Sequence, residues 1–420
     1  DKELWYKAPI TPMDDLHGNL RGIIEHMDDI QNLGIDVLYM TPIFQSNSCH
    51  KYDTTDYYQI DPSFGTTEDL KELVQKAHER GMKVVLDAVY NHTGREFFAF
   101  ADILENGEKS KYRDWYFIDG FPLKSEWGEI PNFKCFGYYG GMPKLNLKNP
   151  EVEKYITDVA CYWIKECDID GWRLDVGDEI SHFFWKNFRK AVKAVKKDML
   201  IIGEIWHYAG DFLEGDEWDT VMNYPFYLNL IDLLADEKIT VSQFVQNLGY
   251  LKGRLHKNCY PLMWNLIDSH DTARFLHLCN DNKKKQHLAA AFQLLLPGMP
   301  MIYYGDEYAM PGANDPDCRR GMYWDEEYQD KEMYEWYKRL IQVRKSHACI
   351  VEGELAGSVT EDEEGTVVLI RKNGEETIAM IFNCSSSAKK FNEYTQKYNL
   401  LTENTFDGNV EGFDAAVIVL

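Results

Sequence analysis

Residues 168–176 have the sequence DIDGWRLDV, the pattern of a short buried strand that ends on charged residues. Trp172 and Leu174 are apolar, whereas Arg173 and Asp175 lie two positions apart. Because side chains two residues apart on a strand share a face, we expect Arg173 and Asp175 to point to the same side of a sheet. Buried charge is costly unless it is paired or used in chemistry. By itself the stretch predicts either a structural ion pair or a pair of functional residues.

Three other apolar runs also end in carboxylates or histidine. They are residues 84–92 (VVLDAVYNH), 201–206 (IIGEIW) and 265–271 (NLIDSHD). In a parallel barrel the C-terminal ends of the strands carry the chemistry. Carboxylates at the ends of several strands also suit the two-carboxylate chemistry of glycoside cleavage.

These runs resemble the four signature regions of the α-amylase family of glycoside hydrolases. The matching motifs occur in the family's order and are residues 87–92 (DAVYNH), 171–176 (GWRLDV), 203–206 (GEIW) and 269–271 (SHD). Residues 142–146 (MPKLN) are similar to the fifth-region marker of the neopullulanase, cyclomaltodextrinase and maltogenic-amylase branch. The resemblance covers the chain from about residue 35 to 325, and five motifs in order make it highly specific.

Composition fits a large folded enzyme with a neutral ligand. The chain has 420 residues, of which 45% are hydrophobic and 14% aromatic, enough for a barrel with satellite domains. Its formal net charge of −24 argues against nucleic acid or an anionic membrane as a partner. An α-glucan oligosaccharide or polysaccharide is compatible with this charge.

The cysteine pattern and the N-terminal sequence indicate the cellular compartment of the protein. The nine cysteines are scattered singly with no CxxC pair, which favours thiols in a reducing compartment over disulfides or a zinc site. No apolar run of membrane-spanning length and no signal-peptide pattern is present. We therefore expect a cytoplasmic protein, or an extracellular one if a leader has been removed, since the chain begins with Asp1 rather than Met.

Strand-like and helix-like segments alternate along most of the chain, which predicts a parallel sheet with right-handed crossovers. The expected strands are residues 4–10, 35–40, 82–89, 168–176, 200–206, 219–224, 263–268 and 299–305. The expected helices are residues 22–33, 67–80, 150–165, 182–196, 284–296 and 324–345, with 226–255 mainly helical. The predicted fold class is α/β: a TIM (β/α)8 barrel with an irregular insertion after strand 3 and a C-terminal all-β domain.

The domain prediction follows from segment lengths. More than 80 residues separate Asp87 from Asp170, whereas a barrel of about 250 residues allots roughly 31 to each strand–helix unit. We expect a catalytic barrel of residues 1–92 and 146–346 and an inserted domain B of residues 93–145. Short β-rich runs after His347 predict a C-terminal β-sandwich domain of residues 347–420.

The N-terminal region departs from the family pattern. Residues 4–10 are either an abbreviated first strand or the start of a chain that has lost that strand. The family usually has a longer loop there, which in this branch often holds calcium, so no cofactor is expected to be required and calcium remains possible. Members of the branch usually carry a β-domain ahead of the barrel that completes the partner's site in a dimer. Nothing precedes the barrel in this sequence, so we expect an open cleft and a monomer or weak dimer.

The resemblance assigns three catalytic carboxylates. Asp175 maps to the nucleophile, which must be ionised, and Glu204 maps to the acid/base, which must hold a proton. Asp271 maps to the third carboxylate, which binds sugar hydroxyls and favours the oxocarbenium-like state. Gly177-Asp178 departs from many relatives and adds an acid near the nucleophile.

The resemblance also assigns sugar contacts at the cleavage point. Tyr52, in the loop HKYDTTDYY of residues 50–58, maps to the tyrosine that stacks on the sugar ring. His92 and His270 would donate hydrogen bonds that tighten in the transition state, and Arg173 would pair with Asp175. His50 is either a further sugar contact or a solvated loop histidine.

The remaining assignments lie farther from the cleavage point. Trp206 and His207 would shape the acceptor side, or else be a core tryptophan and a solvated histidine. The loop GANDPDCRR, residues 312–320, resembles a loop of the branch in which Asp315 and Arg319 hold the next sugar; a loop ion pair is the alternative. The last two predicted site residues, which support the site structurally, are Asp87 and Asn91.

These assignments predict a retaining α-glucan hydrolase that cleaves α-1,4-glucosidic bonds of maltooligosaccharides, cyclodextrins, pullulan or starch by double displacement. An α-glucan transglycosylase or an ordinary starch-degrading α-amylase is the alternative. A non-enzymatic relative would be expected to have lost one of the three carboxylates, and all three are present.

Overall fold

The computed structural model describes residue 11 and residues 16–124, 130–256 and 258–420. The chain divides into two compact units. The N-terminal unit comprises Met13–Ile205 and Asp211–Val221, and the C-terminal unit comprises Asp1–Pro12, Trp206–Gly210 and Met222–Leu420. The predicted first strand, residues 4–10, lies outside the described residues.

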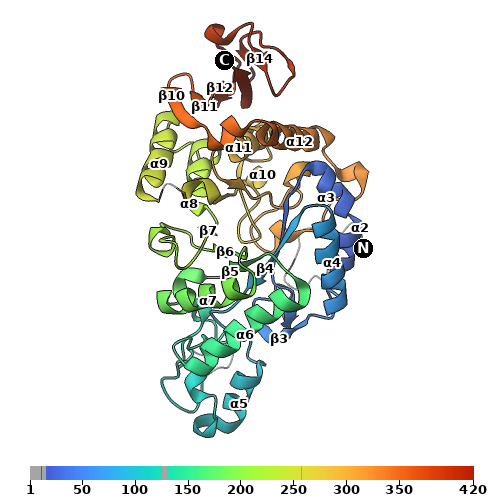
Figure 1. Ribbon diagram of the computed structural model, residues 1–420, viewed down its shortest axis with the longest axis vertical. Coiled ribbons are helices and arrows are strands. Elements are labelled where there is room, and N and C mark those ends of the chain that lie inside the picture. The colour runs from blue at the N-terminus through green and yellow to red at the C-terminus, as the bar shows by residue number, and fades with distance from the viewer. Residues whose placement is uncertain (1–10, 12–15, 125–129, 257) are drawn as a thin grey trace. The chain divides into compact units, whose positions relative to one another are not determined.

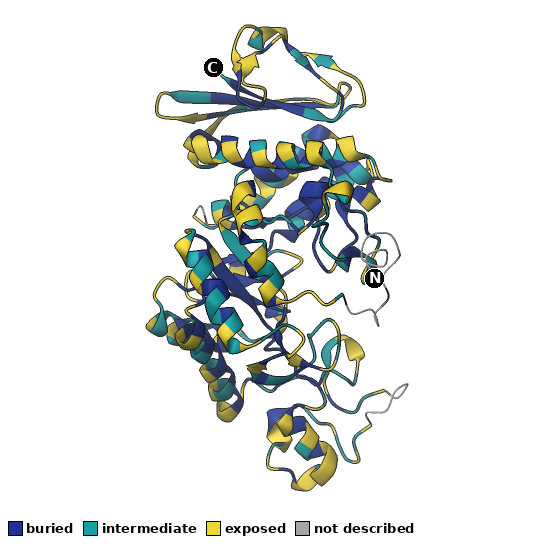
Figure 2. Cartoon of the chain, turned by 90° about the vertical axis from the view of Figure 1, so that its right-hand side faces the viewer, coloured by how far each residue is buried: buried dark blue, intermediate teal, exposed yellow. Residues whose placement is uncertain are grey.

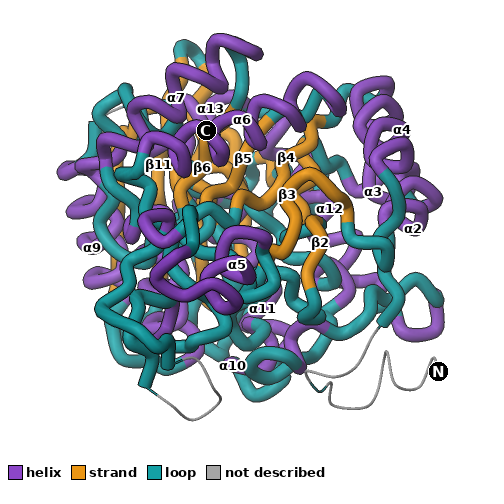
Figure 3. The backbone as a smooth tube through the Cα atoms, turned by 90° about the horizontal axis from the view of Figure 1, so that it is seen from below, coloured by secondary structure: helices purple, strands orange, loops and turns teal. Residues whose placement is uncertain are grey.

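A five-stranded parallel sheet is the centre of the N-terminal unit. Its strands, in spatial order, are β1 (Val37–Met40), β4 (Lys83–Ala88), β5 (Gly171–Leu174), β6 (Leu200–Gly203) and β7 (Thr220–Val221). Figure 3 shows β4, β5 and β6 side by side. Every residue of β5 is buried, which is typical of a parallel strand covered on both faces.

Most of the helices beside this sheet begin at a residue whose side chain caps the first turn. These helices are α2 (Leu20–Glu25), α3 (Met27–Leu33), α4 (Thr67–Glu79), α6 (Pro150–Cys167) and α7 (His182–Val195), α3 being the exception. Thr66 and Asp69 form a capping box at α4, and Asn149 caps α6, whose first residue is a proline. Figure 2 shows helices with exposed residues on one side, and β4 and β5 consist almost entirely of buried residues.

The prediction of one continuous helix over residues 22–33 is wrong. The segment is two helices, α2 and α3, because His26 between them leaves the helical conformation, with φ −101° and ψ 14°. Gly34 ends α3 in the left-handed conformation, as its position in the sequence predicts.

The predicted insertion after the third strand has little regular structure apart from one helix, α5 (Phe98–Asn106). Three short 3₁₀ turns follow, at Gly107–Lys109, Arg113–Trp115 and Phe136–Tyr138. Isolated bridges join His92 to Lys144, Tyr116 to Leu145, Ile118 to Phe133 and Cys135 to Pro143. A hairpin of β2 (Phe44–Ser46) and β3 (Thr54–Ile60) precedes it. The exact domain boundaries stay a prediction.

The C-terminal unit contains a parallel pair, β8 (Trp264–Asn265) and β9 (Met299–Pro300). Its helices are α8 (Tyr224–Leu230), α9 (Val241–Arg254), α10 (Phe275–Leu278), α11 (Lys283–Leu295), α12 (Lys331–Ser346) and α13 (Ala348–Glu352). A π-helical turn, Ile231–Ala235, continues α8. Buried residues occur all around α11, which marks it as the central helix of this unit.

An antiparallel sheet occupies the end of the chain. Its strands, in spatial order, are β10 (Glu354–Glu361), β11 (Thr366–Asn373), β12 (Glu376–Asn383), β17 (Asp414–Val419), β14 (Tyr398–Asn399) and β15 (Asn404–Thr405). A second pair consists of β13 (Lys389–Lys390) and β16 (Asn409–Val410). The sheet packs on α11, and Figure 1 shows the two next to each other. The rings of Phe292 on α11 and Phe382 on β12 stack, with their centroids 4.2 Å apart.

Most predicted strands contain an observed strand. The matches are 35–40 with β1, 82–89 with β4, 168–176 with β5, 200–206 with β6, 219–224 with β7, 263–268 with β8 and 299–305 with β9. Among the described residues, no helix is long and apolar enough to cross a membrane.

Candidate active site

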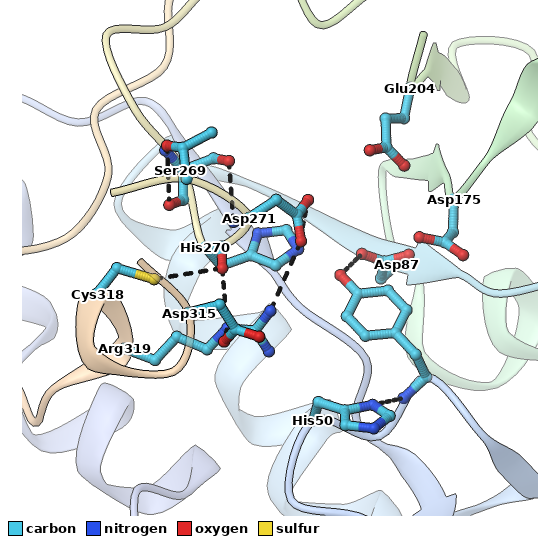
Figure 4. A network of polar contacts seen from close by, with 12 residues as sticks. His50, Asp87, Asp175, Glu204, Ser269, His270, Asp271, Asp315, Cys318 and Arg319 are labelled. Carbon is cyan, nitrogen blue, oxygen red and sulfur yellow. Dashed lines mark hydrogen bonds and ion pairs between the residues drawn. The ribbon is translucent and has the colours of Figure 1, made fainter. Parts of the chain in front are cut away.

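One buried guanidinium, that of Arg173, binds three carboxylates at the C-terminal ends of β4, β5 and β6. Its Nη1 lies 2.9 Å from Asp87 Oδ2 and 2.9 Å from Asp175 Oδ1, and its Nη2 lies 2.8 Å from Glu204 Oε2. The parallel register pairs Asp87 of β4 with Arg173 of β5. We call these four residues the Arg173 cluster; Figure 4 shows its three carboxylates.

The charges of this cluster do not balance. One cation faces three acids, and Arg173 and Asp87 have no exposed side-chain surface. Burial raises the pKa of Asp87 to about 6, although the charge of Arg173 and a hydrogen bond from Tyr39 act against the rise. Asp87 therefore binds a proton more readily than an exposed aspartate does.

Two phenols complete the surroundings of Asp87. Tyr39 Oη donates to Asp87 Oδ2 at 2.7 Å, and Tyr52 Oη donates to the same atom at 3.2 Å. Burial raises the pKa of Tyr52 well above its usual value, so its phenol stays protonated and donates. The Tyr52 N–H donates to His50 Nδ1 at 3.0 Å, and the two rings stack. His50 thus supports Tyr52, whatever further contacts it makes with a ligand.

His92 is held inside the protein. Its Nε2 lies 3.0 Å from the carbonyl oxygen of Tyr52, which makes Nε2 the protonated nitrogen, and its Nδ1 lies 3.4 Å from Asn91 Nδ2. Burial lowers the pKa of His92 to about 4, so the imidazole is neutral at physiological pH. Both ring nitrogens thus have protein partners, and the predicted sugar contact of His92 would have to share one of them.

The segment of residues 142–146 is bound to the same strand end. Lys144 Nζ donates to Asn91 Oδ1 and lies 2.8 Å from Glu179 Oε2, and the Leu145 N–H donates to the Asn91 carbonyl at 3.0 Å. Asn91 Nδ2 donates to Glu179 at 3.2 Å. The supporting role predicted for Asn91 agrees with these contacts, and they add Lys144 and Glu179 to the site.

A second group of predicted residues lies in the C-terminal unit, in the segments after β8 and β9. His270 Nε2 lies 3.2 Å from Asp271 Oδ2, and Arg319 Nη2 lies 3.6 Å from Asp271 Oδ1. Arg319 Nε donates to the His270 carbonyl at 2.9 Å, and the Asp271 N–H donates to Ser269 Oγ at 3.1 Å. We call His270, Asp271 and Arg319 the Asp271 group (Figure 4).

Asp315 and Arg319 form an ion pair of 2.8 Å, and the Asp315 side chain is 51% exposed. The loop ion pair that the sequence left open is therefore present. Because Arg319 also contacts Asp271 and the His270 carbonyl, the pair links the loop of residues 312–320 to these two residues. The predicted sugar contact of Asp315 stays a prediction.

Beneath the Asp271 group lies a buried cluster that the sequence analysis missed. Arg274 Nη1 is 3.2 Å from Asp306 Oδ1, and Asp268 Oδ2 accepts the Phe275 N–H at 2.7 Å. Burial raises the pKa of both Asp268 and Asp306, and in the case of Asp306 the charge of Asp268 adds to the rise. Burial and the neighbouring carboxylate thus both favour the protonated form of Asp306.

Trp206 is not a core residue. It is 41% exposed, and one face of its indole stacks on the buried ring of Tyr224, with ring centroids 3.9 Å apart. The core alternative for Trp206 is thus wrong, because its side chain is partly exposed. His207 is also exposed, and its Nδ1 lies 3.3 Å from the carbonyl of Tyr208.

No cluster of acidic, histidine and cysteine side chains suited to a metal ion occurs in the described part of the chain. Residues 11, 16–124, 130–256 and 258–420 contain no group of three or more His, Cys, Asp or Glu side chains arranged to hold a metal ion. The loop after the predicted first strand lies mostly outside these residues, so the expectation about calcium stays a prediction.

Comparison with known proteins identifies the family. The family profile "Alpha amylase, catalytic domain" matches residues 10–329. The chain belongs to the α-amylase family. The "Cyclomaltodextrinase" of Geobacillus thermopakistaniensis (strain MAS1) is 47% identical over 384 residues, 91% of this chain and 65% of that protein. The chain thus spans slightly less than two thirds of the length of that relative.

Solved structures agree. A "Cyclomaltodextrinase" structure matches with a TM-score of 0.94 at 39% identity, covering 98% of this chain and 73% of that chain. The "Cyclic alpha-maltosyl-(1-->6)-maltose hydrolase" of Arthrobacter globiformis matches with a TM-score of 0.91 at 35% identity, covering 99% and 92%. The predicted family and the predicted barrel with a C-terminal all-β domain are confirmed.

Proposed function

We propose that this protein is a retaining hydrolase of α-1,4-glucosidic bonds in α-glucans. The observation that carries the proposal is the sharing of one guanidinium by Asp175 and Glu204, at 2.9 and 2.8 Å. A retaining glycosidase needs two carboxyl groups about 5–5.5 Å apart. Two carboxylates that contact Nη1 and Nη2 of the same guanidinium are close enough to each other to act as such a pair.

In the proposed mechanism Glu204 first acts as the acid. Its Oε2 accepts the Val176 N–H at 3.0 Å and contacts Arg173, so the transferable proton belongs on Oε1. Oε1 donates this proton to the glycosidic oxygen while an Asp175 oxygen attacks the anomeric carbon, and the C–O bond to the leaving sugar breaks. Glu204 then takes a proton from water, which attacks the same carbon and releases Asp175.

The other assignments rest on the motifs and on local contacts. We propose that Asp271 is the third carboxylate; its contacts with His270 and Arg319 hold a carboxylate in one orientation, as that role requires. Tyr52 is proposed as the stacking residue, because its phenol is fixed on Asp87 and its backbone on His50. The exposed part of the Trp206 side chain is proposed to bind the acceptor sugar.

The substrate class is proposed from the relatives: maltooligosaccharides, cyclodextrins, pullulan or starch. A second candidate is the hydrolysis of small cyclic α-glucans, because the Arthrobacter globiformis hydrolase matches over 92% of its own chain. Transfer to an acceptor sugar in place of water stays the alternative reaction. No nucleic acid or membrane is proposed as a partner, given the net charge of −24.

We propose a reducing, cytoplasmic compartment. Cys167, Cys279, Cys318 and Cys349 are buried thiols without disulfides, a pattern typical of proteins that fold where thiols stay reduced. Whether the protein is a monomer or a weak dimer stays a prediction, which size-exclusion chromatography with light scattering would test.

The deciding experiment compares products from β-cyclodextrin, pullulan and soluble starch for the wild type and Asp175→Asn. Cyclodextrin opening and panose from pullulan would support the cyclomaltodextrinase type. Starch cleavage alone would favour an ordinary α-amylase. Asp178→Asn is the matched control, since Asp178 is an exposed acid close in sequence. Undiminished activity of Asp175→Asn would refute the mechanism, and NMR of the first-formed anomer tests retention.

A further inference from the structure

The residue that follows Asp175 has a strained backbone. Val176 has φ 47° and ψ 43°, the left-handed conformation, which a β-branched side chain rarely adopts. In this conformation the Val176 N–H donates to Glu204 Oε2 at 3.0 Å, so one backbone donor links the residue beside the proposed nucleophile to the proposed acid. Strained backbone persists only where its surroundings hold it in place. The contacts around Val176 therefore bear on the position of Glu204.

Two buried tryptophans of the same unit contact Gly177, the next residue. Trp185 Nε1 donates to the Gly177 carbonyl at 2.8 Å. The ring of Trp218 lies so close to the Gly177 Cα that a Cβ added there would be 2.8 Å from Cζ2 and 3.1 Å from Cη2. Both tryptophans are 1% exposed, and their rings meet edge to face with centroids 6.1 Å apart. One hydrogen bond and one close packing contact thus fix Gly177.

Trp218 also packs on the strand that carries the proposed acid. A Cβ added at Gly203, the residue before Glu204, would lie 2.2 Å from Trp218 Cε3. The ring therefore fills the space between Gly177, just after β5, and Gly203, at the end of β6. Phe212 stacks on Trp218, with centroids 4.0 Å apart and planes 5° from parallel, so the ring itself is held in one orientation.

The shape of the Trp218 ring makes these contacts, and its polar group does not. The atoms nearest to the added Cβ positions at Gly177 and Gly203 include five carbons of the six-membered ring of the indole. Trp218 Nε1 has no hydrogen-bond partner among the residues that the structure describes. Phenylalanine at position 218 would therefore lose volume next to the two glycines without losing a hydrogen bond of the indole.

We propose that Trp218 is a positioning residue for Glu204. Its ring holds Gly177, and Gly177 holds Val176 in the conformation in which the Val176 N–H binds Glu204 Oε2. With Oε2 bound in this way, Oε1 is the oxygen that can carry the transferable proton. Because Trp218 is 1% exposed, it acts through the backbone of this turn and not by contact with a substrate. The inference rests on the proposed function, because it takes Glu204 as the acid.

A positioning residue and an ordinary core residue differ in their effect on two substrates. Maltotriose releases glucose, whose oxygen needs a proton from the acid, whereas α-maltosyl fluoride releases fluoride, which needs much less help from an acid. Both substrates present the same maltosyl group to Asp175. A displaced Glu204 therefore slows the cleavage of maltotriose selectively, whereas a weakened fold slows both reactions by the same factor.

The test changes the fit between positions 177 and 218. Gly177→Ala adds a methyl group too close to the indole, and Trp218→Phe removes ring atoms beside both glycines. Each variant should lower kcat/KM about 10- to 100-fold for maltotriose but less than about three-fold for α-maltosyl fluoride, with KM for maltotriose within about three-fold of the wild type. In the double variant the methyl group occupies space that the indole has left. Its kcat/KM for maltotriose should return to within about five-fold of the wild type.

Trp163→Phe is the matched control. Trp163 is also a fully buried tryptophan of the N-terminal unit, but it stacks on Phe44 and donates to the Tyr57 carbonyl at 2.8 Å. This variant should lower the thermal unfolding midpoint and change kcat/KM for both substrates by the same factor. Trp185→Phe, which removes the hydrogen bond to the Gly177 carbonyl, should reproduce the selective loss on maltotriose and decides the matter if Trp218→Phe does not fold.

Three results would overturn the proposal. Equal losses on the two substrates in Trp218→Phe would make Trp218 an ordinary core residue. Wild-type kinetics with maltotriose in that variant would show that the ring does not act on Glu204. A double variant no more active than Gly177→Ala would show that the two positions do not share one space.

The proposed function and the positioning role fail separately. If the wild type cleaves neither substrate, or if Asp175→Asn cleaves maltotriose at the full rate, the proposed function fails. A crystal structure of Gly177→Ala still decides the geometry: the Val176 N–H should have moved away from Glu204 Oε2, and it should return in the double variant. An unchanged contact of 3.0 Å in Gly177→Ala would overturn the positioning role.

Discussion

Replacing Arg173 with methionine tests the electrostatic basis of the site. The guanidinium is fully buried and contacts Asp87, Asp175 and Glu204 at 2.8–2.9 Å. Methionine fills a similar volume but leaves up to three buried negative charges uncompensated. Breaking a buried ion pair by removing one partner typically costs about 3–5 kcal/mol, and we expect Arg173→Met to lose at least this much of the free energy of unfolding at pH 7.5.

The loss should depend on pH in a defined direction. The folded-state pKa of Asp87 is about 6, above the unfolded value of about 3.9. A raised carboxyl pKa gives stability that is complete below about pH 4 and is lost as pH rises through about 6. The charge of Arg173 opposes this rise, so removing it extends the loss to higher pH. The deficit of Arg173→Met relative to the wild type should therefore grow between pH 5 and pH 8.

Urea unfolding at pH 5 and pH 8, followed by tryptophan fluorescence, measures this deficit. Arg274→Met is the matched control: Arg274 is also fully buried but contacts Asp306 in the C-terminal unit. Arg173→Lys should recover part of the stability and little activity, because one ammonium cannot reproduce the planar fork. A deficit below about 1 kcal/mol, or one equal at both pH values, would refute this account of the cluster.

Three further predictions concern other contacts. Lys144→Met, which breaks the 2.8 Å pair with Glu179, should lower kcat/KM on β-cyclodextrin about 10-fold with an unchanged circular dichroism spectrum, and wild-type kinetics would contradict the bracing role. Phe292→Ala, which removes the stack on Phe382, should cost about 3–5 kcal/mol in urea unfolding; a loss under about 1 kcal/mol would show that the sheet is held elsewhere. Asp306→Asn should flatten the loss of stability with rising pH, since burial raises its carboxyl pKa, and an unchanged slope in urea titrations would contradict this raised pKa.

Local spacing predicted contacts within one strand well. The two-residue spacing of Arg173 and Asp175 predicted a shared face, and their 2.9 Å contact confirms it. The contacts of Arg173 with Asp87 and Glu204 were not predicted, because they depend on the register between β4, β5 and β6. Periodicity within a strand carries no information about that register.

The sequence also did not predict the residues whose contacts depend on a neighbouring strand or on a loop distant in the chain. Tyr39 is a single tyrosine within an apolar strand, and only the pairing of β1 with β4 brings its hydroxyl to Asp87. Asp268 and Asp306 lie 38 positions apart, and the raised pKa of each carboxyl follows from burial, which the sequence does not specify. The motif NLIDSHD did place Asp268 at a buried strand end, which was the one available signal.

Residues 142–146, which resemble the marker of one family branch, lie outside the strands that carry the Arg173 cluster. They nevertheless contact residues next to that cluster. Lys144 and the Leu145 N–H bind the side chain and backbone of Asn91, next to His92. Glu179 bonds both Lys144 and Asn91, and it lies four residues after Asp175. The marker therefore ties the inserted segment to the ends of β4 and β5, the strands that position Asp87 and Asp175. We therefore expect a substitution in residues 142–146 to displace residues of the Arg173 cluster without changing the fold. The motif is then expected to differ between proteins whose sites differ in shape.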